Sequence, residues 1–142
     1  MYKQAELDYD IFLAFSAADY DYARYLNEEL ILHAKTTWFE HNFLSPKEFR
    51  EEVFRGVEQS KNFVCILTKN GLKDLELRAQ IGHARKLKKR IVLLTFEEIL
   101  DEDFPSDYTT LAPVHFTSNF SNYRYSFSEL IRVLDVDREH VQ

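Results

Sequence analysis

The sequence predicts an α/β fold in which a single sheet of five parallel strands is covered by helices on both faces. Two observations support this prediction most directly. Short apolar runs alternate along the chain with longer segments whose apolar residues follow helical spacing. The strand-like runs are apolar throughout, as in strands buried on both faces, and no hairpin turn signals separate them. Consecutive strands are therefore expected to be joined by helices.

The first strand is predicted at the run from Ile11 to Phe15, which is too short for a helix and too apolar for a sheet with one wet face. The run ends abruptly in Ser-Ala-Ala-Asp. Ser16 is predicted to cap the following helix, and Asp19 to complement the positive end of its dipole. This strand is expected to lie at the centre of the sheet.

The other elements follow in the alternating order of a flavodoxin-like three-layer sandwich. Further strands are expected at residues 35–39, 62–68, 91–95 and 114–116, with a loop at 69–74. The Ser45-Pro46-Lys47-Glu48 segment is a strong helix start, and the last helix is expected to open at Ser126. Four helices are expected, each with one apolar inner face. In chain order, these faces consist of Ala23, Leu26, Leu30 and Ala34; Phe49, Val53 and Val57; Leu75, Ala79, Gly82 and Leu87; and Leu130, Ile131 and Leu134.

Composition limits the function classes. The chain has 142 residues, enough for one domain, and no run as long and apolar as a membrane span. The start has no apolar core of a signal peptide, so a cytoplasmic location and no membrane partner are expected. The net charge of -6 argues against a duplex nucleic-acid surface, which would need a basic face.

Several kinds of chemistry lack their motifs in this sequence. Cys65 lies within an apolar run and is expected to be a core residue instead of a nucleophile. The five histidines show no metal-ligand spacing, so no metal site is expected. There is no Gly-x-Gly-x-x-Gly, Walker loop or Gly-x-Ser-x-Gly elbow, and a receiver domain would want an acidic residue where the third strand ends in Thr68-Lys69.

The candidate binding residues follow from the topology. In parallel sheets of this kind, ligands bind at the carboxyl ends of the strands, where the strand order reverses. The residues delivered to that edge are Phe15, Ser16 and Asp19 after the first strand, Trp38 and Glu40 after the second, and Thr68 after the third.

Motifs in this order resemble the Toll/interleukin-1 receptor (TIR) domain. The first is Tyr-Asp-(apolar)-Phe-(apolar)-Ala-Phe-Ser-x-x-Asp, beginning at Tyr9. Trp-Phe-Glu at 38–40 and Leu-Ser-Pro-Lys-Glu-Phe at 44–49 resemble the family's second strand and BB loop, with Glu, Lys and Phe in place of its usual Asp, Gly and Trp. Residues 57–64 resemble its next helix-to-strand passage. The similarity covers nearly the whole chain, so residues 1–142 are expected to be a single TIR domain.

The resemblance implies two different functions. Many bacterial, plant and some animal TIR domains cleave NAD+, as substrate and without a cofactor, at the nicotinamide-ribosyl bond, and yield ADP-ribose or a cyclic form. Others act only as assembling adaptors. A gap-free count places the family's catalytic Glu on Gln80, with Glu76 one turn earlier as a displaced alternative. An NAD+-cleaving domain of microbial immunity, impaired by Gln80, is the leading hypothesis; a nucleoside-cleaving transferase of similar architecture is a third.

The resemblance also implies homotypic partners. TIR domains associate through the BB loop, which here is the segment 40–47 with the apolar pair Phe43 and Leu44. These two side chains either contact a neighbouring copy or fold under onto their own domain. The sequence leaves open whether Gln80 is natural or introduced, and whether a further domain follows Gln142.

Overall fold

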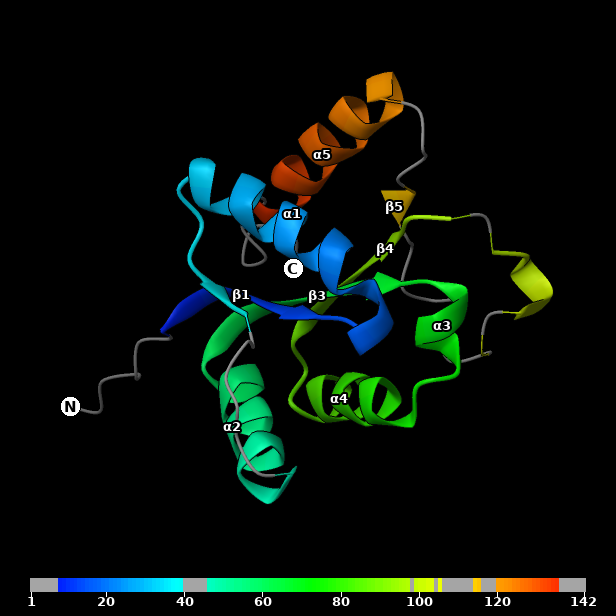
Figure 1. Cartoon of the computed structure of the whole chain (residues 1–142). Coiled ribbons are helices and arrows are strands. Elements are labelled where there is room, and N and C mark those ends of the chain that lie inside the picture. Colours follow the sequence, from blue (N-terminus) through cyan, green and yellow to red (C-terminus); the bar gives the residue numbers. More distant parts are fainter. Residues whose placement is uncertain are drawn as a thin grey trace.

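The computed structural model describes residues 8–39, 46–97, 99–103, 105, 114–115 and 120–135. Their strands form one parallel sheet in the order β2-β1-β3-β4-β5 (Figure 1). The predicted α/β class with a parallel sheet is therefore confirmed. The strands are β1 (Tyr9–Ala14), β2 (Thr37–Trp38), β3 (Ser60–Leu67), β4 (Arg90–Thr95) and β5 (Val114–His115).

The helices lie on both faces of the sheet, as predicted. Helices α1 and α5 cover one face, and α2 and α4 cover the other (Figure 1). The helical segments are η1 (Ala17–Asp19), α1 (Tyr20–Leu32), α2 (Pro46–Glu58), α3 (Lys69–Leu72), α4 (Leu75–Lys86), η2 (Asp101–Asp103) and α5 (Phe120–Asp135). The result is a three-layer sandwich with a separate hydrophobic core on each side of the sheet.

The apolar strands explain the two cores. Because side chains alternate along a strand, Ile11 and Leu13 pack toward α1 and α5, whereas Phe12 and Ala14 pack toward α2 and α4. β3 divides its residues in the same way. Both central strands therefore need apolar residues at nearly every position, which is the pattern that the sequence shows.

The predicted inner face of α4 is wrong. Leu75 is 78% exposed, and Ala79, Gly82 and Leu87 are also exposed. The buried residues of this helix are Leu77, Gln80, Ile81 and Ala84. Two stripes with the same i, i+4, i+7 spacing exist in this segment, and the one with the larger apolar side chains is buried because it removes more apolar surface from water.

Some predicted boundaries and caps also differ. The expected loop at 69–74 contains the short helix α3, and α5 begins at Phe120, six residues before the predicted Ser126. β2 covers only Thr37–Trp38, and Ala34, expected on the inner face of the first helix, is exposed beyond the end of α1. Neither Ser16 nor Asp19 caps a helix through its side chain.

A tight contact between β2 and α2 fixes the position of Trp38. The indole stacks on Phe12, with ring centroids 4.7 Å apart, and its other contacts reach the backbone of α2 at Gly56. A Cβ atom at Gly56 would lie 2.7 Å from ring atoms of Trp38. Only glycine therefore lets the helix approach the indole this closely.

We expect Gly56→Ala to destabilise the fold by about 1–3 kcal/mol, because the added methyl overpacks against a ring that is already stacked on its far side. Gly82→Ala is the matched control, since a Cβ there meets nothing within 4 Å. It should stabilise α4 by roughly 0.5–1 kcal/mol through helix propensity. Urea unfolding measures both. If the two variants shift the free energy of unfolding equally, the Trp38 contact does not constrain position 56.

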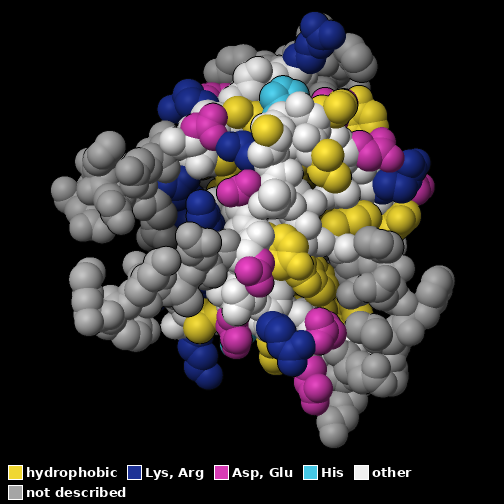
Figure 2. Space-filling model, turned by 90° about the vertical axis from the view of Figure 1, so that its left-hand side faces the viewer, with side chains coloured by type: hydrophobic (Ala, Val, Ile, Leu, Met, Phe, Trp, Pro, Cys, Tyr) yellow, Lys and Arg dark blue, Asp and Glu magenta, His cyan; other side chains and the backbone are white. Residues whose placement is uncertain are grey.

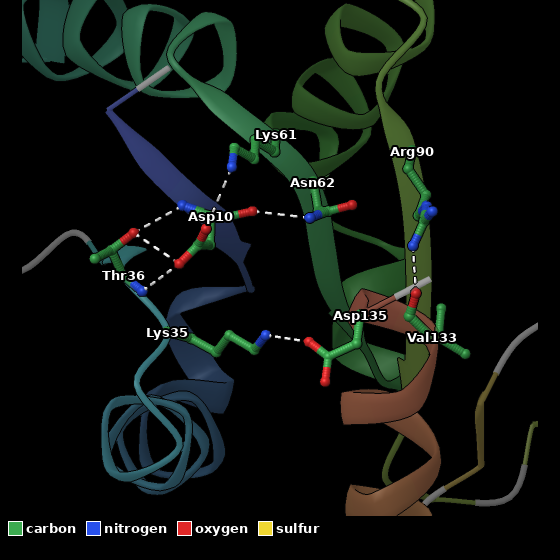
Figure 3. A network of polar contacts seen from close by, with 8 residues as sticks. All are labelled: Asp10, Lys35, Thr36, Lys61, Asn62, Arg90, Val133 and Asp135. Carbon is green, nitrogen blue, oxygen red and sulfur yellow. Dashed lines mark hydrogen bonds and ion pairs between the residues drawn. The ribbon is translucent and has the colours of Figure 1, made fainter. Parts of the chain in front are cut away.

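Polar contacts at the amino edge of the sheet tie β1, β3 and β4 to neighbouring elements (Figure 3). The Asp10 carboxylate accepts hydrogen bonds from the Thr36 amide at 2.9 Å and hydroxyl at 3.1 Å. Lys35 pairs with Asp135, and Arg90 donates to the Val133 carbonyl, so two cations hold the last turn of α5. This edge thus anchors a helix, whereas the expected binding residues lie at the opposite edge.

The surface seen in Figure 2 lies on the left in Figure 1, where β1 begins and α1 ends. Positive and negative side chains are interspersed on it, and they do not gather into one basic area. A duplex nucleic-acid interface needs clustered cations. This face therefore offers no such footprint among the described residues.

Candidate functional site

The strand order reverses between β1 and β3, because β2 lies on one side of β1 and β3 lies on the other. The chain leaves β1 into residues 15–19 and leaves β3 at Thr68. Adjacent loops that diverge in this way form the usual ligand site of a parallel sheet. The carboxyl edge between β1 and β3 is accordingly where the candidate site is built.

Asp19 and Thr68 meet at this edge, although they are far apart in the sequence. The Thr68 hydroxyl donates to the Asp19 carboxylate over 2.5 Å and accepts from the Gly71 amide over 3.0 Å. Both side chains are buried, with exposed fractions of 4% and 1%. Thr68 therefore caps the short helix α3 and fastens it to the loop after β1.

The charge around Asp19 is unbalanced. Burial raises the pKa of the Asp19 carboxyl, and the nearby carboxylates of Glu97 and Asp74 raise it further. Hydrogen bonds from Thr68 and Asn70 oppose that rise in pKa without cancelling it. Glu97 is itself held at the edge, where it accepts from the Lys69 amide over 2.6 Å. The site thus holds a carboxyl group that takes up a proton more readily than an exposed aspartate does.

This rise in pKa predicts a pH-dependent stability. A carboxyl group whose pKa is higher in the folded state favours folding below its unfolded pKa, and this contribution is lost as the pH rises through the folded pKa. Asp19→Asn removes the charge and keeps an oxygen for the Thr68 hydroxyl. We expect the variant to melt above the wild type near neutral pH, with the difference disappearing at about pH 4.

Thermal unfolding between about pH 4 and pH 8 measures this effect. Asp21→Asn is the control, because Asp21 is exposed in the first turn of α1. The prediction fails if the unfolding temperatures of the wild type and Asp19→Asn differ by the same amount at every pH, or if Asp21→Asn responds equally. Either result would show that ionisation of Asp19 does not destabilise the fold.

The aromatic residues at this edge divide between the two faces of the sheet. Phe15 packs with Phe39 and Tyr20 toward α1, with ring centroids 5.4 Å and 6.2 Å away. Trp38 packs toward α2 and α4. Adjacent positions at the end of β2 send Trp38 and Phe39 to opposite sides, so the structure does not bring Phe15 and Trp38 together. Ser16 is buried, and its carbonyl accepts from the Asp19 amide over 2.8 Å.

Gln80 and Glu76 differ sharply in their surroundings. Gln80 lies on the inner side of α4 and is 6% exposed. Glu76 lies one turn earlier, 3.7 Å from the guanidinium of Arg50 on α2, and the side chains of Arg50 and Glu76 are 64% and 39% exposed. The predicted site residue Glu40 lies outside the described residues. The roles assigned to Gln80, Glu76 and Glu40 stay predictions.

Sequence reasoning missed Glu97 and Asn70, which both act on the Asp19 carboxyl. Asn70 lay in a segment expected to be a loop, and Glu97 lay in an acidic run expected to be a surface connection. No local pattern links either residue to Asp19. Only the parallel pairing of β3 with β4 places their following residues at one edge.

The remaining reactive groups offer no further centre in the part of the chain that the structure describes. Cys65 is fully buried, and burial together with the nearby Asp19 carboxylate raises the pKa of its thiol, so the thiol stays protonated. No cluster of three or more His, Cys, Asp and Glu side chains there could hold a metal ion. Likewise, none of the described helices is long and apolar enough to cross a membrane.

Known structures share this fold. The TIR domain of the Toll-related receptor TRR-2 from Hydra magnipapillata aligns with a TM-score of 0.76 at 13% identity, covering 90% of this chain and 99% of that one. A TIR-STING receptor from C. gigas gives 0.73 at 17% identity, covering 96% of this chain, which spans only 43% of the receptor chain. A CMP N-glycosidase from Clostridium botulinum gives 0.57 at 17% identity, covering 85% of this chain and 98% of that one.

Sequence comparison supplies the family. No curated protein matches the chain significantly. A family model described as "TIR domain" matches residues 11–131, which run from the core of β1 into α5 and include all the described strands beyond the start of β1. Because this match covers most of the chain and agrees with the fold, the protein belongs to the TIR domain family.

Proposed function

We propose that this TIR domain binds NAD+ at the carboxyl edge of the sheet and serves immune or stress signalling, with Gln80 in the place of a catalytic carboxylate. The observation that carries the proposal is the burial of a polar side chain, Gln80, on the inner side of α4. The Gln80 side chain is nearly enclosed, whereas the Glu76 carboxylate is already paired with Arg50. Gln80 is thus the better candidate to meet a polar ligand.

The reaction would break the bond between nicotinamide and C1′ of the ribose. The bonding electrons leave with nicotinamide, which becomes neutral, and positive charge builds on the ribose. Water then adds at C1′ and loses a proton, giving ADP-ribose; attack by a ring nitrogen of the adenine would give a cyclic product instead. A carboxylate beside the ribose stabilises the developing charge, while an amide only hydrogen-bonds the hydroxyls. Binding without efficient turnover is the expected behaviour of this chain.

One comparison is consistent with this chemistry. The Clostridium botulinum protein of similar fold is a CMP N-glycosidase, so its chain carries an N-glycosidic activity on this architecture. At 17% identity the likeness extends to the fold alone. Because of this likeness, a nucleotide other than NAD+ is an alternative substrate for the present chain. An assay with CMP in place of NAD+ distinguishes the two.

The alternative function is a non-enzymatic scaffold that works by assembly with other TIR domains. Its supporting observation is the uncharged Gln80 itself, because a scaffold has no need of a carboxylate there. One of the similar structures contains the TIR domains of the activated Roq1 resistosome, which directly recognises the pathogen effector XopQ. Nicotinamide release from NAD+ by this chain and by its Gln80→Glu form separates the two functions. If neither form cleaves NAD+ when assembled, the scaffold is the function that remains.

A further inference from the structure

The passage from β3 to α4 is short, and hydrogen bonds fasten it to two other loops of the carboxyl edge. It contains the four-residue helix α3, which lies between the end of β3 and the start of α4 (Figure 1). Thr68 donates to Asp19 in the segment after β1, and the Lys69 amide donates to Glu97 after β4. The Asn70 side chain adds a hydrogen bond to the Asp19 carboxylate. Carboxylates from both neighbouring loops therefore hold the start of this passage.

The same hydrogen bonds continue into α4. The Thr68 hydroxyl accepts from the Gly71 amide over 3.0 Å, and the Gly71 carbonyl accepts from the Asp74 amide over 3.1 Å. The Asp74 carboxylate then caps α4, because it accepts from the amides of Glu76 and Leu77 over 2.9 Å and 3.1 Å. A continuous series of hydrogen bonds thus links the segment after β1 to the first turn of α4.

Side-chain packing reinforces this link. Gly71 is buried, and a Cβ atom there would lie 3.2 Å from the side chain of Leu77. Leu77 is itself buried, and Gln80 lies three residues further along on the same buried side of α4. Helix α3 therefore rests against the turn of α4 that precedes Gln80, and a movement of α3 would be transmitted to position 80.

We propose that Thr68 is a positioning residue for Gln80, which acts by fixing the start of α4 to the segment after β1. Its hydroxyl joins the two sides of the link, since it donates to Asp19 and accepts from α3. The side chain is 1% exposed, so water cannot easily take the place of a lost hydroxyl. Without this hydroxyl, α3 is released from Asp19, and the Gln80 side chain shifts relative to the carboxyl edge.

The consequence for the reaction rests on the proposed function, because it takes Gln80 as the residue that meets NAD+. The link between Thr68 and α4 does not depend on that function. A measurement without ligand can therefore test the link by itself, and a kinetic measurement can then test its consequence.

Nuclear magnetic resonance of the ligand-free chain tests the link. The side-chain amide signals of Gln80 are identified by their absence in Gln80→Glu. Thr68→Val keeps the shape of the side chain and removes the hydroxyl, so we expect the Gln80 signals to shift or broaden. Thr68→Ser keeps the hydroxyl and should restore them. Asn70→Ala removes the second hydrogen bond to Asp19 from an exposed position and should shift the Gln80 signals by less than Thr68→Val does.

Ser60→Ala is the matched control, because Ser60 lies at the opposite end of β3. Its hydroxyl is also buried, and it donates to the Gly56 carbonyl over 2.7 Å. Ser60→Ala and Thr68→Val each lose a buried hydrogen bond, so both should lower the unfolding temperature, but Ser60→Ala should leave the Gln80 signals in place. Unchanged Gln80 signals in Thr68→Val, or an equal shift in Ser60→Ala, would overturn the proposal. If Thr68→Val does not fold, unchanged signals in Asn70→Ala would overturn it.

Kinetics in the Gln80→Glu background test the consequence for the reaction. There Thr68→Val should lower kcat for NAD+ by about tenfold to a hundredfold and change KM by less than about threefold, because a displaced carboxylate loses an interaction made in the transition state. Thr68→Ser should recover most of kcat, and Ser60→Ala should leave it unchanged. If Gln80→Glu does not cleave NAD+, the proposed function fails and the resonance result still decides the link. If it cleaves NAD+ and Thr68→Val keeps the full kcat, the positioning role fails and the proposed function stands.

Discussion

Replacing Gln80 with glutamate is expected to raise nicotinamide release from NAD+ by roughly two to four decades. The variant changes one amide to a carboxylate of nearly the same shape on the inner side of α4. A unit charge pair at about 4 Å with an effective dielectric constant of about 20 is worth roughly 4 kcal/mol, or about a thousandfold in rate. Because the charge on the ribose develops only in the transition state, kcat should rise more than the affinity for NAD+.

The same substitution should lower the stability of the ligand-free protein. Position 80 is 6% exposed, and a carboxylate there loses most of its hydration. A cost of about 1–3 kcal/mol is expected, with a raised pKa for the new carboxyl group. A gain in turnover together with a loss in stability is the pattern expected when a catalytic carboxylate is placed at position 80.

Two controls make the assay specific. Ala79→Glu adds the same charge to the neighbouring exposed position of α4 and should leave turnover unchanged. Glu76→Gln removes the surface carboxylate paired with Arg50. Equal turnover in the wild type and Gln80→Glu under assembling conditions would refute the role of position 80. A loss of activity on Glu76→Gln alone would transfer the role to Glu76.

The sheet could be predicted because its signal is local. A strand buried on both faces needs an apolar residue at nearly every position, and β1, β3 and β4 all show this directly. The inner face of α4 could not be predicted from spacing, because Leu75 and Leu77 each begin a stripe of the same spacing. The stripe beginning at Leu75 includes Gly82, which has no side chain to bury. Weighing side-chain volume as well as spacing would have favoured Leu77.

The missed start of α5 has a similar cause. Ser126-Phe127-Ser128-Glu129 has the composition of a helix start, yet it lies inside a helix that begins at Phe120. Ser126 is buried there, next to the buried Phe127. A capping signal is a statement about unpaired amides, and in the interior of a helix those amides are already paired.

The sequence predicted which edge of the sheet the site residues reach, but not which side chains contact one another there. Asp19 and Thr68 were both assigned to the carboxyl edge, and the structure joins them with a hydrogen bond. Phe15 and Trp38 lie on opposite faces of the sheet, and Trp38 is held on its face by close packing against Gly56. A glycine in the middle of a helix gives no sign in the sequence of which ring it will contact.

Substituting both Phe43 and Leu44 with Asp is expected to abolish assembly, together with any activity seen in the Gln80→Glu form. Both residues lie outside the part of the chain that the structure describes. The expectation follows from their chemistry, since two large apolar side chains in an otherwise polar segment lose hydration free energy unless something covers them. If a neighbouring copy covers them, the contact joins two different surfaces, and repetition gives an open filament unless the rotation closes. Light scattering and electron microscopy measure the assembly.

A matched control separates this contact from a general effect of added charge. Ile31→Asp with Leu32→Asp places two carboxylates on adjacent apolar residues that are 54% and 78% exposed on α1. This control should fold and assemble as the parent does. Unfolding of the Phe43 and Leu44 variant would show instead that the pair belongs to its own core, where a buried carboxylate costs several kcal/mol or more. Normal assembly of that variant would show that the interface lies on another surface. Any dependence of activity on protein concentration would then arise from contacts at that surface and not from residues 40–47.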